Sequence, residues 1–151
     1  MVNYRRSYTK GATYFFTVNL KNRKENHLTT YIDQLRESLR IVKQQHPFKI
    51  IAIVVLPEHL HTIWTLPEND ANYPKLWRAI KSRFTRLIIK EGVELIKNHR
   101  GEYNLWQPRY WVHQIRDDLH LQRHVEQINY NPVNHGHVLQ LSVKHNYMFL
   151  L

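Results

Sequence analysis

The sequence predicts an α+β fold, in which helices pack on an antiparallel β-sheet. Three observations lead to this prediction. Residues 50–66 form an apolar stretch that Leu56-Pro57-Glu58 interrupts, as expected of two strands joined by a tight turn. Two further segments carry apolar residues at helical spacing. The elements follow one another as strand, helix, strand, strand and helix.

The first predicted strand covers residues 12–20, and a helix follows it. Residues 12–20 are rich in aromatic and β-branched side chains, which strands favour. Thr29 or Thr30 is a suitable N-cap for a helix that reaches to about residue 45 and ends before Pro47. Its apolar positions share one helical face: Ile32, Leu35, Leu39 and Val42.

The apolar stretch supplies the centre of the predicted sheet. Residues 50–55 are continuously apolar, so we expect this strand to be buried on both faces. The next strand carries His59 and His61, which alternation places on one face, and we expect Leu60 and Ile63 on the other. Two imidazoles on one face of a strand can hold a divalent metal ion.

The spacing of these two histidines is weak evidence when it is taken alone. The chain has 11 histidines in 151 residues, and at that composition chance gives about 0.8 His-x-His pairs. A second pair, His135 and His137, does occur. The position of His59 and His61 beside a buried strand is what makes them candidate metal ligands.

A second helix is predicted over residues 74–90. Its core stripe consists of Leu76, Ile80, Phe84, Leu87 and Ile88. Basic residues occupy much of the remaining surface: Lys75, Arg78, Lys81, Arg83 and Arg86. Such a face is often only solvated. Five positive charges without an acidic partner before Glu91 nevertheless favour contact with phosphate groups.

A short strand is predicted over residues 110–115, in a segment that is rich in aromatic and basic side chains. Four of them are Trp106, Arg109, Tyr110 and Trp111. These side chains either pack in the core or stack on unpaired bases, and the sequence favours neither interpretation.

The last predicted helix is capped by Asp117-Asp118 and reaches to about residue 131, where we expect Pro132 to stop it. Its core-facing positions are Leu121, Val125 and Ile128. An adjacent arc is entirely polar and contains His120, His124, Gln127 and Asn131. This arc could face the two histidines of the sheet.

The order of these elements predicts the ferredoxin-like plan. In this plan a β-α-β-β-α-β chain forms an antiparallel sheet with helices packed on it. We expect residues 1–151 to form one domain, since this length is typical of a single core. The same sheet also serves RNA-binding modules, so the fold does not determine the function.

Composition limits the possible partners. The formal net charge is +10 and the isoelectric point is about 9.9, which favours a polyanionic partner, nucleic acid above all. There is no cysteine, so disulfides and thiolate metal sites are excluded. No stretch approaches the length of a membrane span and no signal peptide is apparent. We therefore expect a cytoplasmic protein that does not bind membranes.

Five segments in sequence order resemble REP-associated tyrosine transposases, which belong to the single-tyrosine HUH transposases. The resemblance covers nearly all of the chain to about residue 138. The segments are NYRRSYTKGATYFFTVNL, VVLPEHLHTIWTLPE, WRAIKSRFTR, WQPRYWVHQIRDD and HVEQINYNPVNHG. Five blocks in the same order are far more specific than a single His-x-His pair.

The resemblance implies an HUH endonuclease fold, usually a homodimer, that acts on single-stranded DNA. The substrate is often a hairpin from repetitive extragenic palindromes. The implied ligands of Mg²⁺ or Mn²⁺ are His59, His61 and Asn131. A tyrosine attacks the scissile phosphate, which yields a 5′-phosphotyrosine link and a free 3′-OH, and reversal rejoins the strand. The expected DNA-binding residues are Arg5, Arg6, Arg78, Lys81, Arg83 and Arg109.

The chain departs from the family at the nucleophile. The tyrosine of the family precedes the asparagine by four residues, and here that position is Gln127. Tyr130 is the nearest phenol, although it points about 60° away from Gln127 on a helix and matches a packing position of relatives. The tail after residue 138 also lacks the Trp-Pro-Tyr-Ser-Ser type of segment that relatives usually carry.

Several hypotheses therefore stay open. Either Tyr130 replaces the missing nucleophile and the protein is a metal-dependent DNA strand transferase, or Gln127 marks a binding module that recognises hairpin DNA without cutting it. Gln127 could itself be an engineered or decayed change. We favour loss of cleavage. An RNA-binding protein without a metal is a third possibility. A Zn²⁺ site of His59 and His61 with His120 or His124 is the alternative metal site.

Overall fold

The structure is a computed structural model that describes the backbone of residues 6–135 and 139–142 and the side chains of residues 6–128. Its strands are β1 (Thr13–Asn19), β2 (Lys49–Val55), β3 (His59–Thr65), β4 (Trp111–Ile115) and β5 (Leu139–Ser142). Its helices are α1 (His27–Thr30), α2 (Ile32–Gln45), α3 (Tyr73–Lys90) and α4 (Asp118–His135).

The five strands form one sheet in the order β4-β1-β3-β2-β5, and every neighbouring pair is antiparallel. The strands β1 and β2 are joined through α2, and β3 lies between them. This arrangement of β1 to β4 with α2 and α3 is the ferredoxin-like plan, so the predicted fold class is confirmed. None of the described helices is long and apolar enough to cross a bilayer.

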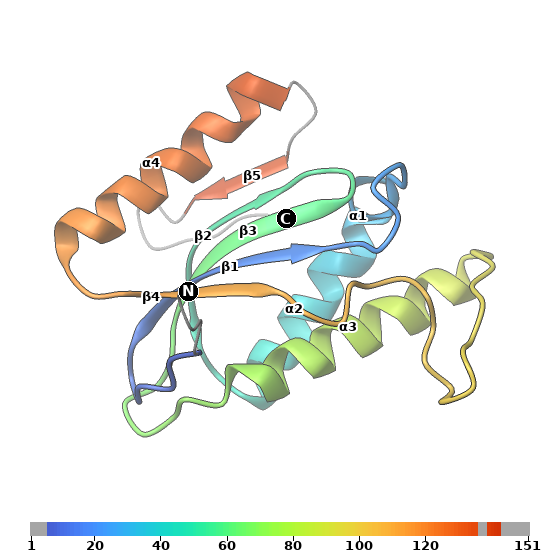
Figure 1. Cartoon of the computed structure of the whole chain (residues 1–151), viewed down its shortest axis with the longest axis horizontal. Coiled ribbons are helices and arrows are strands. Elements are labelled where there is room, and N and C mark those ends of the chain that lie inside the picture. Colours follow the sequence, from blue (N-terminus) through green and yellow to red (C-terminus); the bar gives the residue numbers. More distant parts are fainter. Residues whose placement is uncertain (1–5, 136–138, 143–151) are drawn as a thin grey trace, which may run out of the picture.

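The helices cover both faces of the sheet (Figure 1). The helices α2 and α3 lie side by side on one face, and α4 lies across the other face near β2 and β5. The side chains of the sheet divide accordingly into two buried clusters. The larger cluster lies between the sheet and α2 and α3, and the smaller one lies beneath α4.

Aromatic side chains dominate the larger cluster. Trp64 of β3 is fully buried and stacks on Trp77 of α3, with ring centroids 4.4 Å apart. Phe16 of β1 and Phe48 contact the same indole, at centroid distances of 4.8 and 4.3 Å. These rings join β1, β3 and α3 into one core, because each buried aromatic side chain removes a large apolar area from water.

The smaller cluster places β3 relative to α4. It contains Phe15, Ala52 and Val54, with Ile128 of α4 packed onto them. It also contains Ile63, so the expectation that Ile63 faces away from His59 and His61 was wrong. The strand is regular from His59 to Thr65, and residues 59, 61 and 63 therefore share one face.

The predicted start of the first long helix was also wrong. Thr30 lies inside the short helix α1, and Tyr31 separates α1 from α2 without any cap formed by its side chain. The fully buried Leu28 anchors α1 instead, and its backbone N–H donates to the carbonyl oxygen of Pro57 at 3.1 Å. The contact of Leu28 with Pro57, and not a threonine cap, therefore fixes where the helical segment begins.

The other boundaries differ from the prediction mainly at the end of the chain. Asn72 caps α3, since its side chain accepts a hydrogen bond from the backbone N–H of Lys75. The helix α4 continues through Pro132 to His135, so the predicted stop was wrong, although a proline inside a helix removes a backbone hydrogen bond and crowds the preceding turn. The strand β5 was not predicted. It is four residues long and forms only by pairing with the edge of β2.

The aromatic core leads to a stability prediction. We expect Trp64→Ala to lower the free energy of unfolding by about 3–5 kcal/mol, because the substitution leaves a cavity between β3 and α3. Urea denaturation measures this change. Trp111→Ala is the matched control, since that indole is 55 % exposed on β4 and should cost much less. Equal losses in the two variants would contradict this account of the core.

Candidate functional site

The predicted histidine pair lies on the face of the sheet that α4 covers. His59 and His61 are two residues apart on β3, and their ring centroids are 4.9 Å apart. In the sheet His61 pairs with Thr17 of β1 on one side and with Val54 of β2 on the other. The pair is therefore on a central strand, held by neighbours on both sides.

Two hydrogen bonds orient these imidazoles. The Nδ1 atom of His59 lies 2.8 Å from Oε2 of Glu58, and Nδ1 of His61 lies 2.8 Å from Oγ1 of Thr17. A metal ion would then be held by the Nε2 atom of each ring. A bond from Nδ1–H to a carboxylate, such as the one from His59 to Glu58, fixes the tautomer and raises the basicity of a metal-ligating histidine. The arrangement fits a divalent cation.

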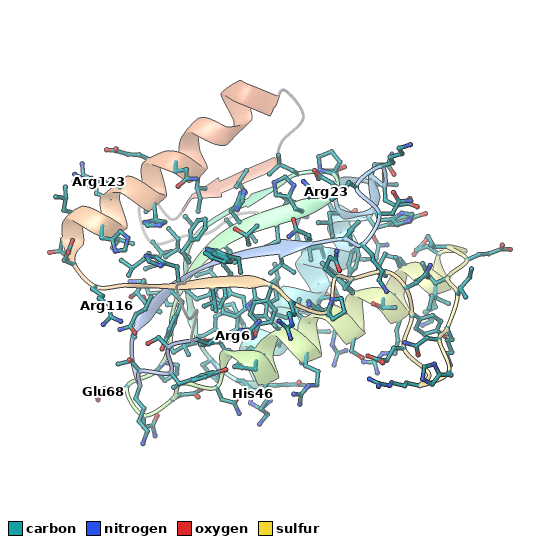
Figure 2. The ribbon with its side chains drawn as sticks, viewed as in Figure 1. Arg6, Arg23, His46, Glu68, Arg116 and Arg123 are labelled. Atoms are coloured by element: carbon teal, nitrogen blue, oxygen red, sulfur yellow. The ribbon has the colours of Figure 1, made fainter. Side chains whose placement is uncertain are left out.

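Sequence reasoning had assigned Glu58 only to the turn, although it precedes His59 directly. The Glu58 carboxylate also lies 4.0 Å from the guanidinium group of Arg23. Figure 2 shows Arg23 at the end of the sheet where β3 begins. The Glu58 carboxylate thus interacts with both the guanidinium group of Arg23 and the imidazole of His59.

Part of the predicted site lies outside the described side chains. The backbone of α4 includes the positions of Tyr130 and Asn131, but their side chains are outside the described residues, as is Arg5 altogether. Gln127 is described, and its side chain is exposed. The structure therefore positions the helix that carries the predicted nucleophile and the third ligand, and leaves their geometry as a prediction.

The histidines of the polar arc of α4 lie next to His113 of β4, and not next to His59 and His61 as expected. His120 and His124 group with His113 of β4, and one ligand atom from each of the three lies within 4.8 Å of the others. The Nε2 atoms of His113 and His120 are 3.0 Å apart. Sequence reasoning had not singled out His113, although it alternates with the core residue Val112 along its strand.

Phe15 separates the two groups of histidines. Its ring centroid lies 5.6 Å from that of His61 and 4.8 Å from that of His124. Among the described side chains, no group of three possible ligands combines His59 or His61 with a histidine of α4. The alternative zinc site predicted from such a combination is therefore not assembled.

The environment of His113 favours its neutral form. Partial desolvation lowers its pKa first, and electrostatic interaction with His120, His124 and Arg116 lowers it further. Figure 2 shows Arg116 after β4 and Arg123 on α4, at the same end of the sheet. Neutral imidazole is the form that binds metal ions.

A basic cavity of about 620 Å³ lies at the other side of β4, against α3. Its lining includes Arg6, Arg78, Lys81, Trp106 and Tyr110. The guanidinium carbon of Arg6 lies 4.2 Å from the ring centroid of Tyr110, and a guanidinium N–H donates to the Tyr110 carbonyl at 3.1 Å. Figure 2 shows Arg6 between β4 and α3.

Lys81 is the most unusual cation of this cavity. Its ammonium group lies 5.1 Å from the Tyr110 ring centroid and donates to the carbonyl oxygen of Gln107 at 3.0 Å. Burial, and then the charge of Arg6, lower the pKa of Lys81 to about 8. Burial raises the pKa of Tyr110 to about 12. A bound anion would restore the charge stabilisation that Lys81 loses on leaving water.

The other predicted DNA-binding residues are placed differently. Arg83 is half-buried on α3 and acts electrostatically on Glu37 of α2, and Arg109 is exposed. Neither lines the basic cavity. Of the described candidates, Arg6, Arg78 and Lys81 are thus brought together, and Arg83 and Arg109 are not.

The aromatic residues near β4 have separate roles. Trp106 is nearly buried, and its indole N–H donates to Oγ1 of Thr85 at 3.2 Å, so it belongs to the core. Trp111 is 55 % exposed and pairs in the sheet with Thr17, which also pairs with His61. An exposed indole therefore lies in the same cross-strand row as His61.

Comparison with known proteins agrees with this arrangement. Residues 8–131 match the family described as transposase IS200 like. The chain is 48 % identical to the REP-associated tyrosine transposase of Escherichia coli over 94 % of its own length and 79 % of that protein. It is 24 % identical to the ISDra2 transposase TnpA of Deinococcus radiodurans over 80 % of its length and 86 % of that protein.

One solved structure extends the comparison to the fold. It is a REP-associated tyrosine transposase bound to a REP hairpin, 48 % identical in sequence, with a TM-score of 0.77. The similarity covers 90 % of this chain and 75 % of that one. The family match spans the strand of the histidine pair, the basic helix and most of α4. The chain therefore belongs to the family of IS200-like transposases.

Proposed function

We propose that this protein is a transposase that recognises single-stranded DNA folded as a hairpin and cleaves and rejoins it. The oriented histidines of the proposed metal site favour this function over the loss of cleavage that Gln127 alone favours. The observation that carries the proposal is the oriented pair of His59 and His61 on the central strand beneath α4. Support comes from the 48 % identity to a transposase solved with a REP hairpin. Recognition of such a hairpin is carried over to this chain as part of the proposal.

The histidine pair and Asn131 are the proposed ligands of Mg²⁺ or Mn²⁺. Such an ion, when bound, supplies Lewis acidity to the scissile phosphate. Glu58 and Thr17 hold the two imidazoles in the orientation that binding requires. The exposed indole of Trp111, in the row of Thr17 and His61, is suited to stack on an unpaired base next to the site.

Tyr130 is the proposed nucleophile for strand cleavage. In the reaction the phenol oxygen bonds to phosphorus while the bond from phosphorus to the 3′ oxygen breaks, and the resulting phosphotyrosine keeps the bond energy for rejoining. A second candidate function is hairpin binding without cleavage. It is favoured by Gln127, an amide at the position where the family carries its tyrosine.

The basic cavity is the proposed contact with the DNA backbone. Arg6, Arg78 and Lys81 converge there, and Arg5, Arg83 and Arg109 are proposed as flanking phosphate contacts. The net charge of +10 favours such contacts and makes them sensitive to salt. We further propose that the protein acts as a homodimer.

A covalent adduct separates the two candidate functions. Unmodified protein, Tyr130→Phe and Gln127→Tyr are each mixed with Mn²⁺ and end-labelled hairpin DNA, and a denaturing gel detects a protein-linked band. The transposase proposal predicts a band for the unmodified protein that Tyr130→Phe loses. The binding-only alternative predicts a band for Gln127→Tyr alone.

A control at the proposed metal site makes the gel decisive. Adding His61→Ala to any variant that gives a band should remove it, because the histidine pair is the proposed metal site. A band that persists after His61→Ala would contradict that assignment. If no variant gives a band, although all of them bind the hairpin, the cleavage chemistry proposed here is wrong.

The lowered pKa of Lys81 leads to a prediction about pH. With a pKa of about 8, Lys81 is about nine-tenths charged at pH 7 and about one-tenth charged at pH 9. Affinity for single-stranded DNA should therefore fall between these pH values. Lys81→Arg should abolish the fall, since a guanidinium group stays charged. Fluorescence anisotropy with labelled DNA measures the affinity, and an identical fall in Lys81→Arg would exclude Lys81 as its cause.

Salt dependence tests the same contact independently. Lys81→Gln should reduce the slope of log affinity against log salt by about 0.7, the value for one phosphate contact on a single strand. Lys90→Gln is the matched control, because Lys90 is exposed at the far end of the same helix and does not line the cavity. A slope that Lys81→Gln leaves unchanged would place the DNA backbone elsewhere.

A further inference from the structure

Three histidines meet where the end of β4 leads into the first turns of α4, and the proposed transposase chemistry does not use them. His113 lies on β4, opposite Phe15 of β1. His120 and His124 are four residues apart on α4, which places them one helical turn apart on the same side of the helix. One ligand atom of each residue lies within 4.8 Å of the other two.

We propose that His113, His120 and His124 bind a Zn²⁺ ion that fastens α4 to β4. This site is separate from the pair of His59 and His61, because the ring of Phe15 lies between His61 and His124. The proposal concerns a second metal of a different chemical class and does not depend on whether the protein cuts DNA.

The distances are close to those of a zinc centre. A tetrahedral site with Zn–N bonds of about 2.0–2.1 Å separates its ligand nitrogens by about 3.3 Å. The Nε2 atoms of His113 and His120 are 3.0 Å apart, and all three ligand atoms lie within 4.8 Å. Small side-chain rotations are therefore enough to bring three nitrogens to one ion.

The hydrogen bonding of His124 also suits a ligand. Its Nδ1 atom lies 2.9 Å from the backbone carbonyl oxygen of His120, which can only accept, so Nδ1 carries the hydrogen. The lone pair of the neutral ring is then on Nε2. A histidine that donates from one nitrogen to a backbone carbonyl and coordinates through the other is the usual arrangement at metal sites.

Hydrogen bonding alone explains less of this arrangement. One bond between His113 and His120 accounts for their 3.0 Å contact, but it gives no role to the third imidazole. The rings of His120 and His124 are nevertheless close, with centroids 4.5 Å apart and planes at 69°. Three imidazoles from two elements, with one ligand atom of each within 4.8 Å of the others, are accounted for together by one coordinated cation.

The donor set selects the class of metal. The described group contains three imidazoles and no carboxylate, which suits Zn²⁺ and its neighbours Co²⁺ and Ni²⁺ better than Mg²⁺ or Mn²⁺. Three histidines leave the fourth coordination position of a tetrahedral ion open. Water can reach this position, because the side chain of His113 is exposed. Arg116 and Arg123 flank this end of the sheet (Figure 2), so dative bonds rather than local charge must supply the affinity.

The consequence for the fold is a fixed position of α4. The same helix carries Gln127, Tyr130 and Asn131, which lie one to two turns beyond His124. A metal that ties His120 and His124 to the sheet restrains the first half of α4. Occupancy of the site would therefore restrain the segment on which the proposed nucleophile and third ligand depend.

The test removes the other metal site first. The full chain with His59→Ala and His61→Ala is titrated with Zn²⁺ by calorimetry, and we expect one bound ion per chain. Adding His124→Ala should weaken this binding by at least about tenfold, which is the lower range for losing even a supporting group of a metal site. His99→Ala, an exposed histidine of the loop before β4, should leave the affinity unchanged.

Further measurements distinguish loss of the metal site from loss of the fold. Co²⁺ bound to the same double variant should give the strong visible absorption of a four-coordinate site, and His120→Gln should remove it. Zn²⁺ should raise the melting temperature of the double variant but not that of the version with His124→Ala. Circular dichroism in the presence of a chelator checks that each variant is folded.

The proposal is overturned if the double variant binds no stoichiometric Zn²⁺. It is equally overturned if His124→Ala and His120→Gln leave the affinity unchanged, because the ion would then be held elsewhere, for instance by His135 and His137. Loss of Zn²⁺ binding in both variants, with His99→Ala unaffected, supports the site.

Discussion

The pairing of β3 between β1 and β2 is the constraint on which the rest of the structure depends. Since β3 is regular, its register sends Leu60 and Trp64 into the aromatic core beneath α2 and α3. The same register sends His59 and His61 to the face under α4. A shift of one residue would exchange these two sets, and it would bury the imidazoles in the aromatic core while moving Trp64 to the face under α4.

The sheet therefore separates two kinds of chemistry. On the α3 side, a cavity lined by Arg6, Arg78 and Lys81 concentrates positive charge over aromatic rings. On the α4 side, imidazoles of β3, β4 and α4 supply nitrogen donors. The two sides meet at β4, which is an edge strand. DNA that contacts both sides would have to pass around that edge, where the exposed indole of Trp111 lies.

Patterns of single elements were predicted well because they depend on local spacing. The core stripe of α3, the apolar residues of β2 and the alternation of His59 and His61 follow directly from helical and strand geometry. The prediction failed at three places: the cap at Thr29 or Thr30, the stop at Pro132 and the absence of a fifth strand. The cap and β5 were decided by contacts with distant residues, namely the bond from Leu28 to Pro57 and the pairing of β5 with β2, and nothing in the described structure explains the continuation through Pro132.

The sequence by itself determined the order of the elements, the histidine pair and the positive charge, because periodicity and composition are properties of neighbouring residues. Only the tertiary structure decided which histidines meet. A helical wheel places His120 and His124 on one arc but cannot say which strand lies opposite. The first turns of α4 lie beside the end of β4 and bring them to His113 instead of His61, and the packing of Phe15 keeps the two groups apart.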